Sequence, residues 1–534
     1  MGPQEENKRE KRGAVTPLRA WLTHPDRLII AWCVVFFLCM IPSLNNSYPY
    51  MGDESFYTVS AMNMIQRGEP LAPFYFGEYR FNKPILAYWV VMGSYYLFGF
   101  SMWSGRVPFL LVAVLTLLVT YRLAFLLFED RSKALLSAVI LSATYNFVSF
   151  SRIAMTDPLL TFFCLLAILF FVQMIRFPER TRFHATCGAV CVGLAVMTKG
   201  PVGLFPWFAA LGTLLLFRTP DRRRSMLALL SPLNVLIVAA MVSPWYVYIA
   251  ANYPQAFAGS MHTEAGILLQ IFDLPGLGRR FLYYSLGIIV LGFPFTAAAL
   301  YVMLKKRALP GSYLSLLLVY LLGSTAFFVL FTNVFKERYL LMVFPPGSIV
   351  LADILYGPRW RSWLKIAMVV FLVQASAFAL YPVVAREPLR ELVATWKQGC
   401  SGTLGFVLQN RKFVGWCRLF AHDENIAPAE TADFLIIAEE YQAQYAGWRV
   451  VRSAPQRKSL RFKNGKFEIR KRIFLLIEAE HPEATGYQGV SRMHFLGVIP
   501  GLTGENVLYR MDDLPRVGRG PPLAQLSTGT TFPL

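Results

Sequence analysis

Acidic and basic side chains lie close to the ends of long apolar runs in this sequence. Asp53 and Glu54 follow the first such run, whereas Asp157 and Lys199 stand at the borders of later ones. Further polar residues in comparable positions are Tyr57, Tyr79, Arg80, Lys83, Arg152, His262, Glu264, Lys336, Glu337, Arg338 and Tyr339. Carboxylates combined with cations suit group transfer away from a phosphate, because the acceptor needs a base and the departing phosphate needs fixed positive charge.

The acids also have structural interpretations. Asp53 and Glu54 could begin a surface helix, since Asp is favoured at the N-cap position. Asp157 precedes Pro158 and could cap the following apolar run in the same way. We predict a catalytic carboxylate at Asp53 and a second important acid at Asp157, and both interpretations stay open for Glu54.

The cations have an alternative as well, because lysine and arginine near a membrane often extend toward lipid headgroups. Lys83 and Lys199 precede Pro and Gly-Pro, and Lys336 and Arg338 lie at the end of an apolar run. We therefore predict contact with a phosphate for these four residues. His262 fits a simple loop histidine better than a metal ligand, because no partner has ligand spacing, and we expect no required metal or other cofactor.

The composition indicates which elements must position these side chains. Of 534 residues, 55% are hydrophobic and only 16% are charged, which is too little charge to cover a soluble domain of this size. The formal net charge is +20, but the basic residues lie mostly in short loops between apolar runs. That distribution is typical of a membrane protein that contacts anionic lipids, so we expect membrane lipids and no nucleic acid as partners.

Several apolar runs are long enough to cross the hydrocarbon core of a bilayer as helices. About eleven spans are predicted: Leu28–Leu44, Val107–Phe128, Ala134–Phe150, Leu159–Ile175, Ala185–Met197, Val202–Phe217, Met226–Ala250, Phe281–Leu304, Tyr313–Phe331, Leu340–Leu355 and Trp363–Val383. The run Pro84–Phe100 is short, contains two glycines and is rich in Tyr and Trp, so we interpret it as an interfacial helix.

The charge distribution orients these spans. With a cytoplasmic N-terminus, the inside loops are all short and basic, as the positive-inside rule requires: Glu129–Lys133, Arg176–His184, Arg218–Ser225, Lys305–Gly311 and Tyr356–Ser362. Counting Pro84–Phe100 as a span would break this alternation. The ionisable residues named at the outset then all lie on the outside, within a few residues of a helix end.

The predicted fold is an all-α polytopic membrane protein with a small extracytoplasmic α/β domain at the C-terminus. Residues 1–27 form a cytoplasmic segment, 28–383 the transmembrane domain with its first outside loop at 45–105, and 384–534 the C-terminal domain. That domain combines strand-like segments at Asp433–Ala438 and Phe467–Ile477 with a helical stretch at Leu389–Trp396. Cys400 and Cys417 form an even pair in a polar domain and could make a disulfide, or remain free thiols.

Common catalytic motifs are absent from the sequence. It contains no Walker, HExxH, GxSxG or CxxC pattern, which argues against an ATPase, a zincin, a serine hydrolase and a thioredoxin-like protein. An outside site would also find no nucleotide. The donor that fits is a sugar on a lipid-linked phosphate, reached laterally from the bilayer.

At these residues the sequence resembles the GT-C superfamily of polyprenyl-phosphate-sugar glycosyltransferases. It is most similar to the branch that contains protein O-mannosyltransferases and lipid A aminoarabinose transferases. The resemblance runs from about Leu28 to Ala352 and weakly into the tail. The motifs that carry it are Asp53-Glu54, Phe81-Asn-Lys-Pro84 leading into Tyr88-Trp89, Leu97-Phe-Gly99 with Arg106, Arg152 through Asp157, and Lys199-Gly-Pro201.

The resemblance implies roles for the candidate residues. Asp53 would be the catalytic base or acceptor-positioning carboxylate, with Asp157 and Glu54 as further acids. The donor phosphate would contact Lys83, with these further candidates: Arg80, Lys199, Lys336 and Arg338. Substrate would also meet Tyr57, Tyr79, Arg152 and Tyr339. Aminoarabinose transferases often carry an acidic residue before the lysine that matches Lys83, where this sequence has Asn82, so a metal site that includes His262 is not expected.

These observations predict an inverting glycosyltransferase in a bacterial inner membrane, with its site and C-terminal domain on the periplasmic side. Its donor would be an undecaprenyl- or similar polyprenyl-phosphate sugar, and its acceptor lipid A or another envelope glycan. A protein O-mannosyltransferase is one alternative. A transporter or flippase for a lipid-linked substrate is another, but transporters place ionisable residues near the bilayer midplane, and the centres of these spans are uncharged.

Overall fold

A computed structural model describes most of the chain in two units. The described residues are 24–45, 53–75, 78–219, 221–269, 274–306, 314–332, 335–385 and 388–399, with six strands between 404 and 479. Unit 1 comprises Met1–Arg386 and unit 2 comprises Glu387–Leu534. Each unit is described by itself.

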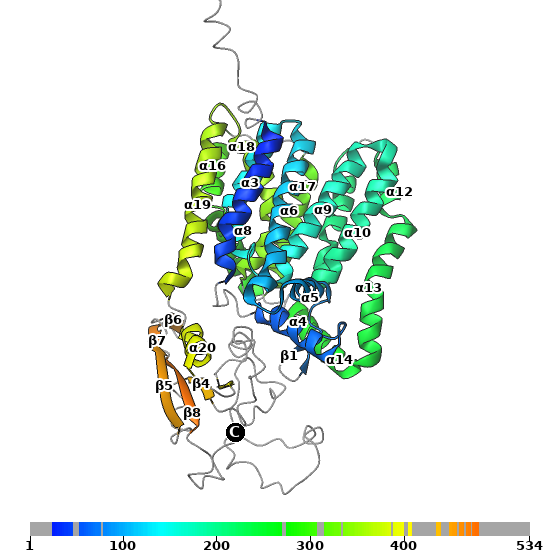
Figure 1. Cartoon of the computed structure of the whole chain (residues 1–534). Coiled ribbons are helices and arrows are strands. Elements are labelled where there is room, and N and C mark those ends of the chain that lie inside the picture. Colours follow the sequence, from blue (N-terminus) through cyan, green and yellow to red (C-terminus); the bar gives the residue numbers. More distant parts are fainter. Residues whose placement is uncertain are drawn as a thin grey trace, which may run out of the picture. The chain divides into compact units, whose positions relative to one another are not determined.

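Unit 1 is a bundle of helices (Figure 1). Its α-helices are α3 (Pro25–Met40), α4 (Ser55–Arg67), α5 (Leu86–Phe98), α6 (Met102–Phe128), α7 (Arg131–Ala143), α8 (Tyr145–Phe150), α9 (Thr156–Arg176), α10 (Thr181–Lys199), α11 (Phe205–Leu216), α12 (Arg222–Leu229), α13 (Pro232–Asn252), α14 (Pro254–Leu269), α15 (Leu274–Leu291), α16 (Phe295–Lys306), α17 (Ser315–Phe331), α18 (Phe344–Leu355) and α19 (Trp360–Ala385). The 3₁₀ turns include η1 (Ile41–Asn45), η3 (Gly200–Leu204) and η6 (Glu337–Met342), and Phe74–Tyr75 (β1) pairs with Glu78–Tyr79 (β2).

The apolar helices make this a multi-pass membrane protein. Within the described residues, six helical stretches are long and apolar enough to cross a bilayer, or up to seven if one bent pair counts as a span, and three further apolar helices are shorter. The count of eleven crossings therefore stays a prediction. The expected span Phe281–Leu304 is not one straight helix, because the helix direction bends by 104° between α15 and α16. Pro294 stands at this break, where its ring and missing N–H interrupt a helix.

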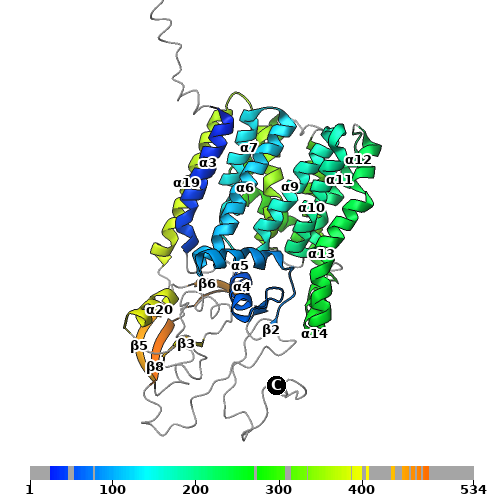
Figure 2. The same ribbon diagram turned by 45° about the vertical axis from the view of Figure 1, so that its right-hand side comes forward.

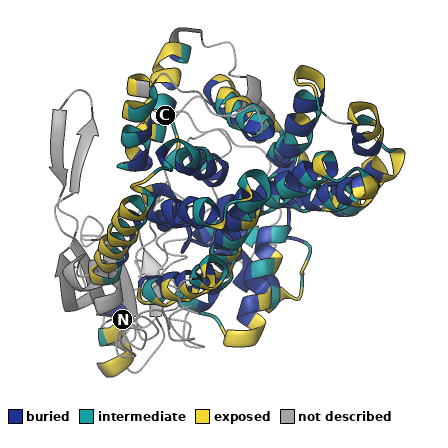
Figure 3. Ribbon diagram, turned by 90° about the horizontal axis from the view of Figure 1, so that it is seen from above, coloured by how far each residue is buried: buried dark blue, intermediate teal, exposed yellow. Residues whose placement is uncertain are grey.

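Helices α9 and α10 form the centre of the bundle. In each of the stretches that contain them, 61% of the most apolar window is buried, against 22% for the stretch containing α13 and 17% for α19. Figure 3 shows the same contrast, with buried residues where helices face one another and exposed residues on the outer faces. A Cβ at Gly188 of α10 would lie 2.3 Å from the ring of Phe171 on α9, so glycine permits the close approach of these two helices.

One end of the bundle carries short elements that connect the spans. Helices α4, α5 and α14 and the β1–β2 hairpin gather there (Figures 1 and 2). Figure 2 shows α5 lying across the end of α6, the arrangement expected of an interfacial helix. The chain turns sharply from α5 into α6 because Ser101 caps α6, with its hydroxyl accepting a hydrogen bond from the backbone N–H of Ser104.

Unit 2 contains one helix and six strands in its described part. Helix α20 (Pro388–Gly399) precedes a sheet of order β3-β4-β8-β5, in which β3 (Leu404–Val407) runs parallel to β4 (Phe434–Ala438). Strands β8 (Ile473–Ala479) and β5 (Trp448–Pro455) are antiparallel to their neighbours, and β6 (Ser459–Lys463) pairs with β7 (Lys466–Arg470). The predicted strand Phe467–Ile477 is therefore two strands. Cys400 and Cys417 lie outside the described residues, so the disulfide stays a prediction.

Candidate active site

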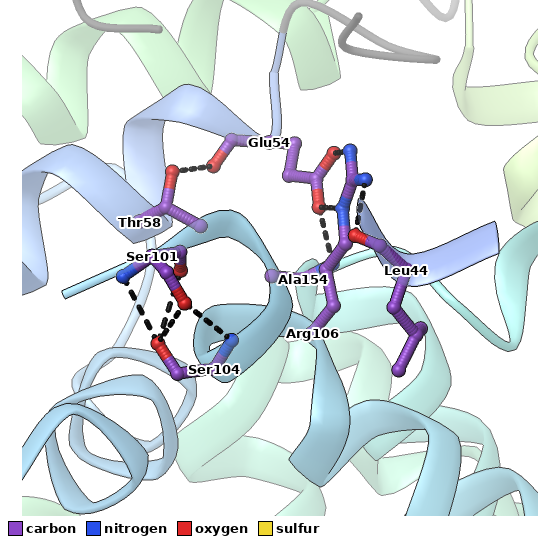
Figure 4. A network of polar contacts seen from close by, with 7 residues as sticks. All are labelled: Leu44, Glu54, Thr58, Ser101, Ser104, Arg106 and Ala154. Carbon is purple, nitrogen blue, oxygen red and sulfur yellow. Dashed lines mark hydrogen bonds and ion pairs between the residues drawn. The ribbon is translucent and has the colours of Figure 1, made fainter. Parts of the chain in front are cut away.

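A buried ion pair joins the segment that precedes α4 to the bundle. Arg106 donates from Nε to Glu54 Oε1 at 2.7 Å and from Nη2 to Oε2 at 2.8 Å, and both side chains are completely buried. Arg106 also donates to the carbonyl of Leu44 at 3.0 Å, while the backbone N–H of Ala154 donates to Glu54 at 2.9 Å. Figure 4 shows how these contacts tie α6, η1, the start of α4 and the segment before α9 into one network.

This network fixes the two chain segments that carry the candidate acids. Glu54 directly follows Asp53, and Ala154 lies three residues before Asp157. An ion pair in a buried place is costly to desolvate, and removal of one partner leaves an uncompensated charge. The contacts of Glu54 and Arg106 therefore hold both acid-bearing segments in a defined position.

Asp53 meets a cation from a distant part of the chain. Its carboxylate pairs with Arg338 of η6, which lies 285 residues away in sequence. The Asp53 side chain is 31% exposed, whereas that of Arg338 is 12% exposed. Asp53 is thus a carboxylate that solvent and small molecules can reach, held next to a fixed guanidinium.

Asp157 and Lys199 form a second ion pair, and this one is buried. Lys199 Nζ lies 2.5 Å from Asp157 Oδ1, with side-chain exposures of 9% and 4%. Asp157 stands in the first turn of α9 and Lys199 is the last residue of α10. Both charges therefore complement the dipole of the helix that carries them. Lys199 also lies 4.5 Å from the ring centre of Tyr339, which brings η6 into the same site.

Lys83 pairs with an acid from α14. Its Nζ donates to the two carboxylate oxygens of Glu264 at 2.8 and 2.7 Å. Both side chains are partly exposed, at 23% for Lys83 and 31% for Glu264. Nearby, the backbone N–H of Phe81 donates to Ser260 Oγ at 3.3 Å. The segment before α5 is therefore attached to α14 at two points.

Arg80 and Tyr57 line the same end of the bundle. Arg80 donates to the hydroxyl of Tyr88 at 3.2 Å and lies 3.9 Å from the ring centre of Phe56. The buried ring of Tyr57 lies 5.3 Å from that of Tyr88. Burial raises the pKa of the Tyr57 hydroxyl above its usual value, so this hydroxyl remains a neutral hydrogen-bonding group.

Two of the predicted substrate-binding residues have other neighbours. Tyr79 donates to Glu69 at 3.1 Å and its ring lies 4.4 Å from that of Tyr253, so it belongs to an aromatic group between the hairpin and the end of α13. Arg152 is buried, with its guanidinium 4.1 Å from the ring centre of Phe378 on α19.

Charge interactions connect the remaining residues into one cluster. Lys336 is exposed, but partial desolvation lowers its pKa, and the neighbouring Arg338 lowers it further, while Asp53 and Asp157 oppose this effect. Lys83 is also close enough to Lys336 to repel it. Burial raises the pKa of Tyr339 to about 12. We call this set the cation cluster: Lys83, Lys199, Lys336 and Arg338 with the acids Asp53 and Asp157.

The described residues offer no group of three or more His, Cys, Asp or Glu side chains that could hold a metal ion. His262 is exposed on α14. The sequence analysis named Glu264 among the polar residues near helix ends and Arg106 within a motif but gave neither a role, whereas the structure gives both a central contact. A signal existed for Arg106, because it is a charged residue directly before the long apolar run Val107–Phe128, whereas nothing in the sequence pairs Glu264 with Lys83.

Comparisons with known proteins match this architecture. Residues 82–248 match a family model described as dolichyl-phosphate-mannose-protein mannosyltransferase. A protein of Aquifex aeolicus is 29% identical over 364 residues, which cover 65% of this chain and 70% of that protein. An undecaprenyl phosphate-alpha-4-amino-4-deoxy-L-arabinose arabinosyl transferase of Yersinia pestis is 25% identical, and the match covers 65% of this chain and 63% of the enzyme. The match thus spans less than two thirds of that enzyme.

Solved structures share the fold. The crystal structure of ArnT from Cupriavidus metallidurans bound to undecaprenyl phosphate has a TM-score of 0.63 at 15% sequence identity and covers 84% of this chain and 97% of that one. Its apo state has a TM-score of 0.64, with coverage of 86% and 98%. The predicted resemblance is confirmed: the chain is similar, in sequence and in fold, to polyprenyl-phosphate-sugar glycosyltransferases of the GT-C type.

Proposed function

We propose that this protein transfers a sugar from a polyprenyl-phosphate carrier, undecaprenyl phosphate in a bacterial inner membrane, to an acceptor on the periplasmic side. The observation that carries the proposal is the cation cluster at one end of the bundle. It places the partly exposed carboxylate of Asp53 beside Arg338, with Lys336 and the buried Asp157–Lys199 pair close by.

The cluster supports a single inverting displacement. The acceptor hydroxyl gives its proton to Asp53, while its oxygen forms a bond to the anomeric carbon from the face opposite the phosphate. The bond between that carbon and the phosphate oxygen breaks, and its electron pair leaves with polyprenyl phosphate. The cations of the cluster, with Arg80 as a further candidate, stabilise the negative charge that develops on the leaving phosphate.

The three acids have different parts in this proposal. Asp53 contacts the acceptor, since it is the most exposed of the three. Asp157 holds Lys199 in place for the phosphate. Glu54, whose two oxygens are engaged by Arg106, is a positioning residue that orients Asp53. Tyr57, Tyr79, Tyr339 and Arg152 remain proposed substrate-binding residues.

For the acceptor, we propose lipid A or a related envelope glycolipid. The arabinosyl transferase name of the Yersinia relative supports this class, although the identity is only 25%. A secreted protein is the second candidate, because the matching family model is described as a protein mannosyltransferase. We propose that the sugar reaches the site from the membrane and that unit 2 lies on the same side as the site.

Comparison of glycans from a deletion strain tests this function. Envelope glycolipids and secreted proteins would be analysed by mass spectrometry after rescue with the wild-type gene or with Asp53→Asn at matched expression. We expect one sugar to be missing from one acceptor class and restored only by the wild type. Unchanged glycans in the deletion strain would contradict the proposed transfer, and equal rescue by both genes would contradict the role of Asp53.

A further inference from the structure

Glu264 occupies the position on Lys83 that a donor phosphate would need. The Lys83 ammonium donates to both oxygens of this carboxylate, at 2.8 and 2.7 Å. An ammonium has three donors and no acceptor, so two of its three hydrogen bonds already go to one anion. One hydrogen remains, so a phosphate that is to accept more than one hydrogen bond from Lys83 must displace a Glu264 oxygen.

The surroundings of Lys83 explain why an anion is needed there. Lys83 lies close enough to Lys199 and Lys336 to repel both. The acids Asp53 and Asp157 pair with Arg338 and Lys199, so Lys83 takes its counter-charge from α14. Positive charges held together in a partly buried place repel one another strongly, and Glu264 relieves that repulsion.

The attachment of α14 makes an exchange of anions geometrically possible. Ser260 and Glu264 are four residues apart and therefore lie on the same face of α14. Ser260 is buried and accepts a hydrogen bond from the backbone of Phe81, a contact that does not involve Lys83. Loss of the Glu264 contact would leave α14 attached at Ser260 while the carboxylate moves away.

We propose that Glu264 is a stand-in anion for the donor phosphate on Lys83, so that carrier binding replaces the carboxylate and product release restores it. This inference rests on the proposed function, in which Lys83 contacts the phosphate. Glu264 thereby sets how tightly the carrier phosphate is held. It is a positioning residue and touches no reacting atom.

Binding of undecaprenyl phosphate to the purified full chain in detergent micelles tests the inference. We expect Glu264→Gln to bind this lipid about threefold more tightly than the wild type, the size of effect associated with a partly exposed ion pair. Thr263→Ala is the matched control, because Thr263 is exposed on the same helix and its hydroxyl bonds only within α14. It should bind like the wild type.

A double-mutant cycle separates competition from simple structural support. In a Lys83→Gln background, Glu264→Gln should have no further effect on binding. If Glu264→Gln folds poorly, Glu264→Ala in the otherwise wild-type protein should show the same tighter binding. Equal or weaker binding by both Glu264 variants would overturn the inference, because the carboxylate would then hold Lys83 in place for the phosphate. Absence of binding by the wild type would instead contradict the proposed function itself, and the inference with it.

Discussion

Three carboxylates, two just before α4 and one at the start of α9, differ in what surrounds them. Glu54 is fully buried and paired with Arg106, Asp157 is 4% exposed and paired with Lys199, and Asp53 is 31% exposed beside Arg338. A general base must reach the proton that it removes. Differences in burial, which cannot be judged from two adjacent acids in a sequence, therefore separate Asp53 from Glu54.

Glu54→Gln tests the buried pair. We expect a loss of roughly 3 kcal/mol in the free energy of unfolding, because Arg106 would keep a buried charge without its counter-ion. Thermal unfolding of the purified protein in detergent would measure the loss. The matched control is Glu69→Gln, which breaks the more exposed pair with Arg67 and should change stability little. Equal unfolding temperatures for the two variants would show that the buried pair is not needed.

Lys336 predicts a pH dependence for donor use. Its pKa is lowered by partial desolvation and by Arg338, so its positive charge is lost at a lower pH than that of a free lysine. We expect the KM for the donor to rise as the pH increases through this lowered pKa. Lys336→Arg should move the rise to higher pH, because arginine keeps its charge throughout. An identical KM profile for the two proteins would exclude Lys336 from phosphate binding.

At the scale of elements, hydropathy located the apolar helices but not their bends or contacts. The broken α15–α16 pair has a sequence signal in Pro294, which the hydrophobic run obscures. Asp53 and Arg338 are 285 residues apart, and one sequence carries no information on which distant residues meet. The sequence did predict that these residues share one side, because the basic loops orient the spans.

Gly188 tests the packing of α9 against α10. An added Cβ would meet the Phe171 ring at 2.3 Å, so Gly188→Ala should reduce the free energy of unfolding by about 1–3 kcal/mol. Gly93→Ala in α5 is the control, because nothing lies within 4 Å of a Cβ at that position. Thermal unfolding would measure the stability of both variants. An unfolding temperature of Gly188→Ala equal to that of the wild type would mean that α9 and α10 can move apart without loss of stability.

On the scale of the whole molecule, the chain shares its fold with a solved structure at only 15% sequence identity. Helix packing sets where α4, α5 and α14 gather at one end of the bundle (Figure 1), and the chemistry depends on that gathering. The helical membrane architecture follows from composition and charge, whereas the GT-C fold was implied by the family resemblance. The acceptor does not, because no residue described in the site distinguishes a glycolipid from a protein.

The orientation of the bundle is also testable. In a cysteine-free background, Glu78→Cys should react with a membrane-impermeant thiol reagent added outside spheroplasts, since Glu78 is exposed in the β1–β2 hairpin. Arg223→Cys, exposed in α12 at the opposite end, should react only after the membrane is opened. The reverse pattern would place the site on the cytoplasmic side.

Transfer of a labelled sugar by the purified protein tests the central claim most directly. Wild type and Asp53→Asn would be compared with a radiolabelled polyprenyl-phosphate sugar and a lipid A acceptor, with undecaprenyl phosphate binding measured in parallel to show that the variant is folded. We predict transfer by the wild type and a rate at least about 100-fold lower for Asp53→Asn, with carrier binding retained. Equal transfer rates for the two proteins would contradict the account.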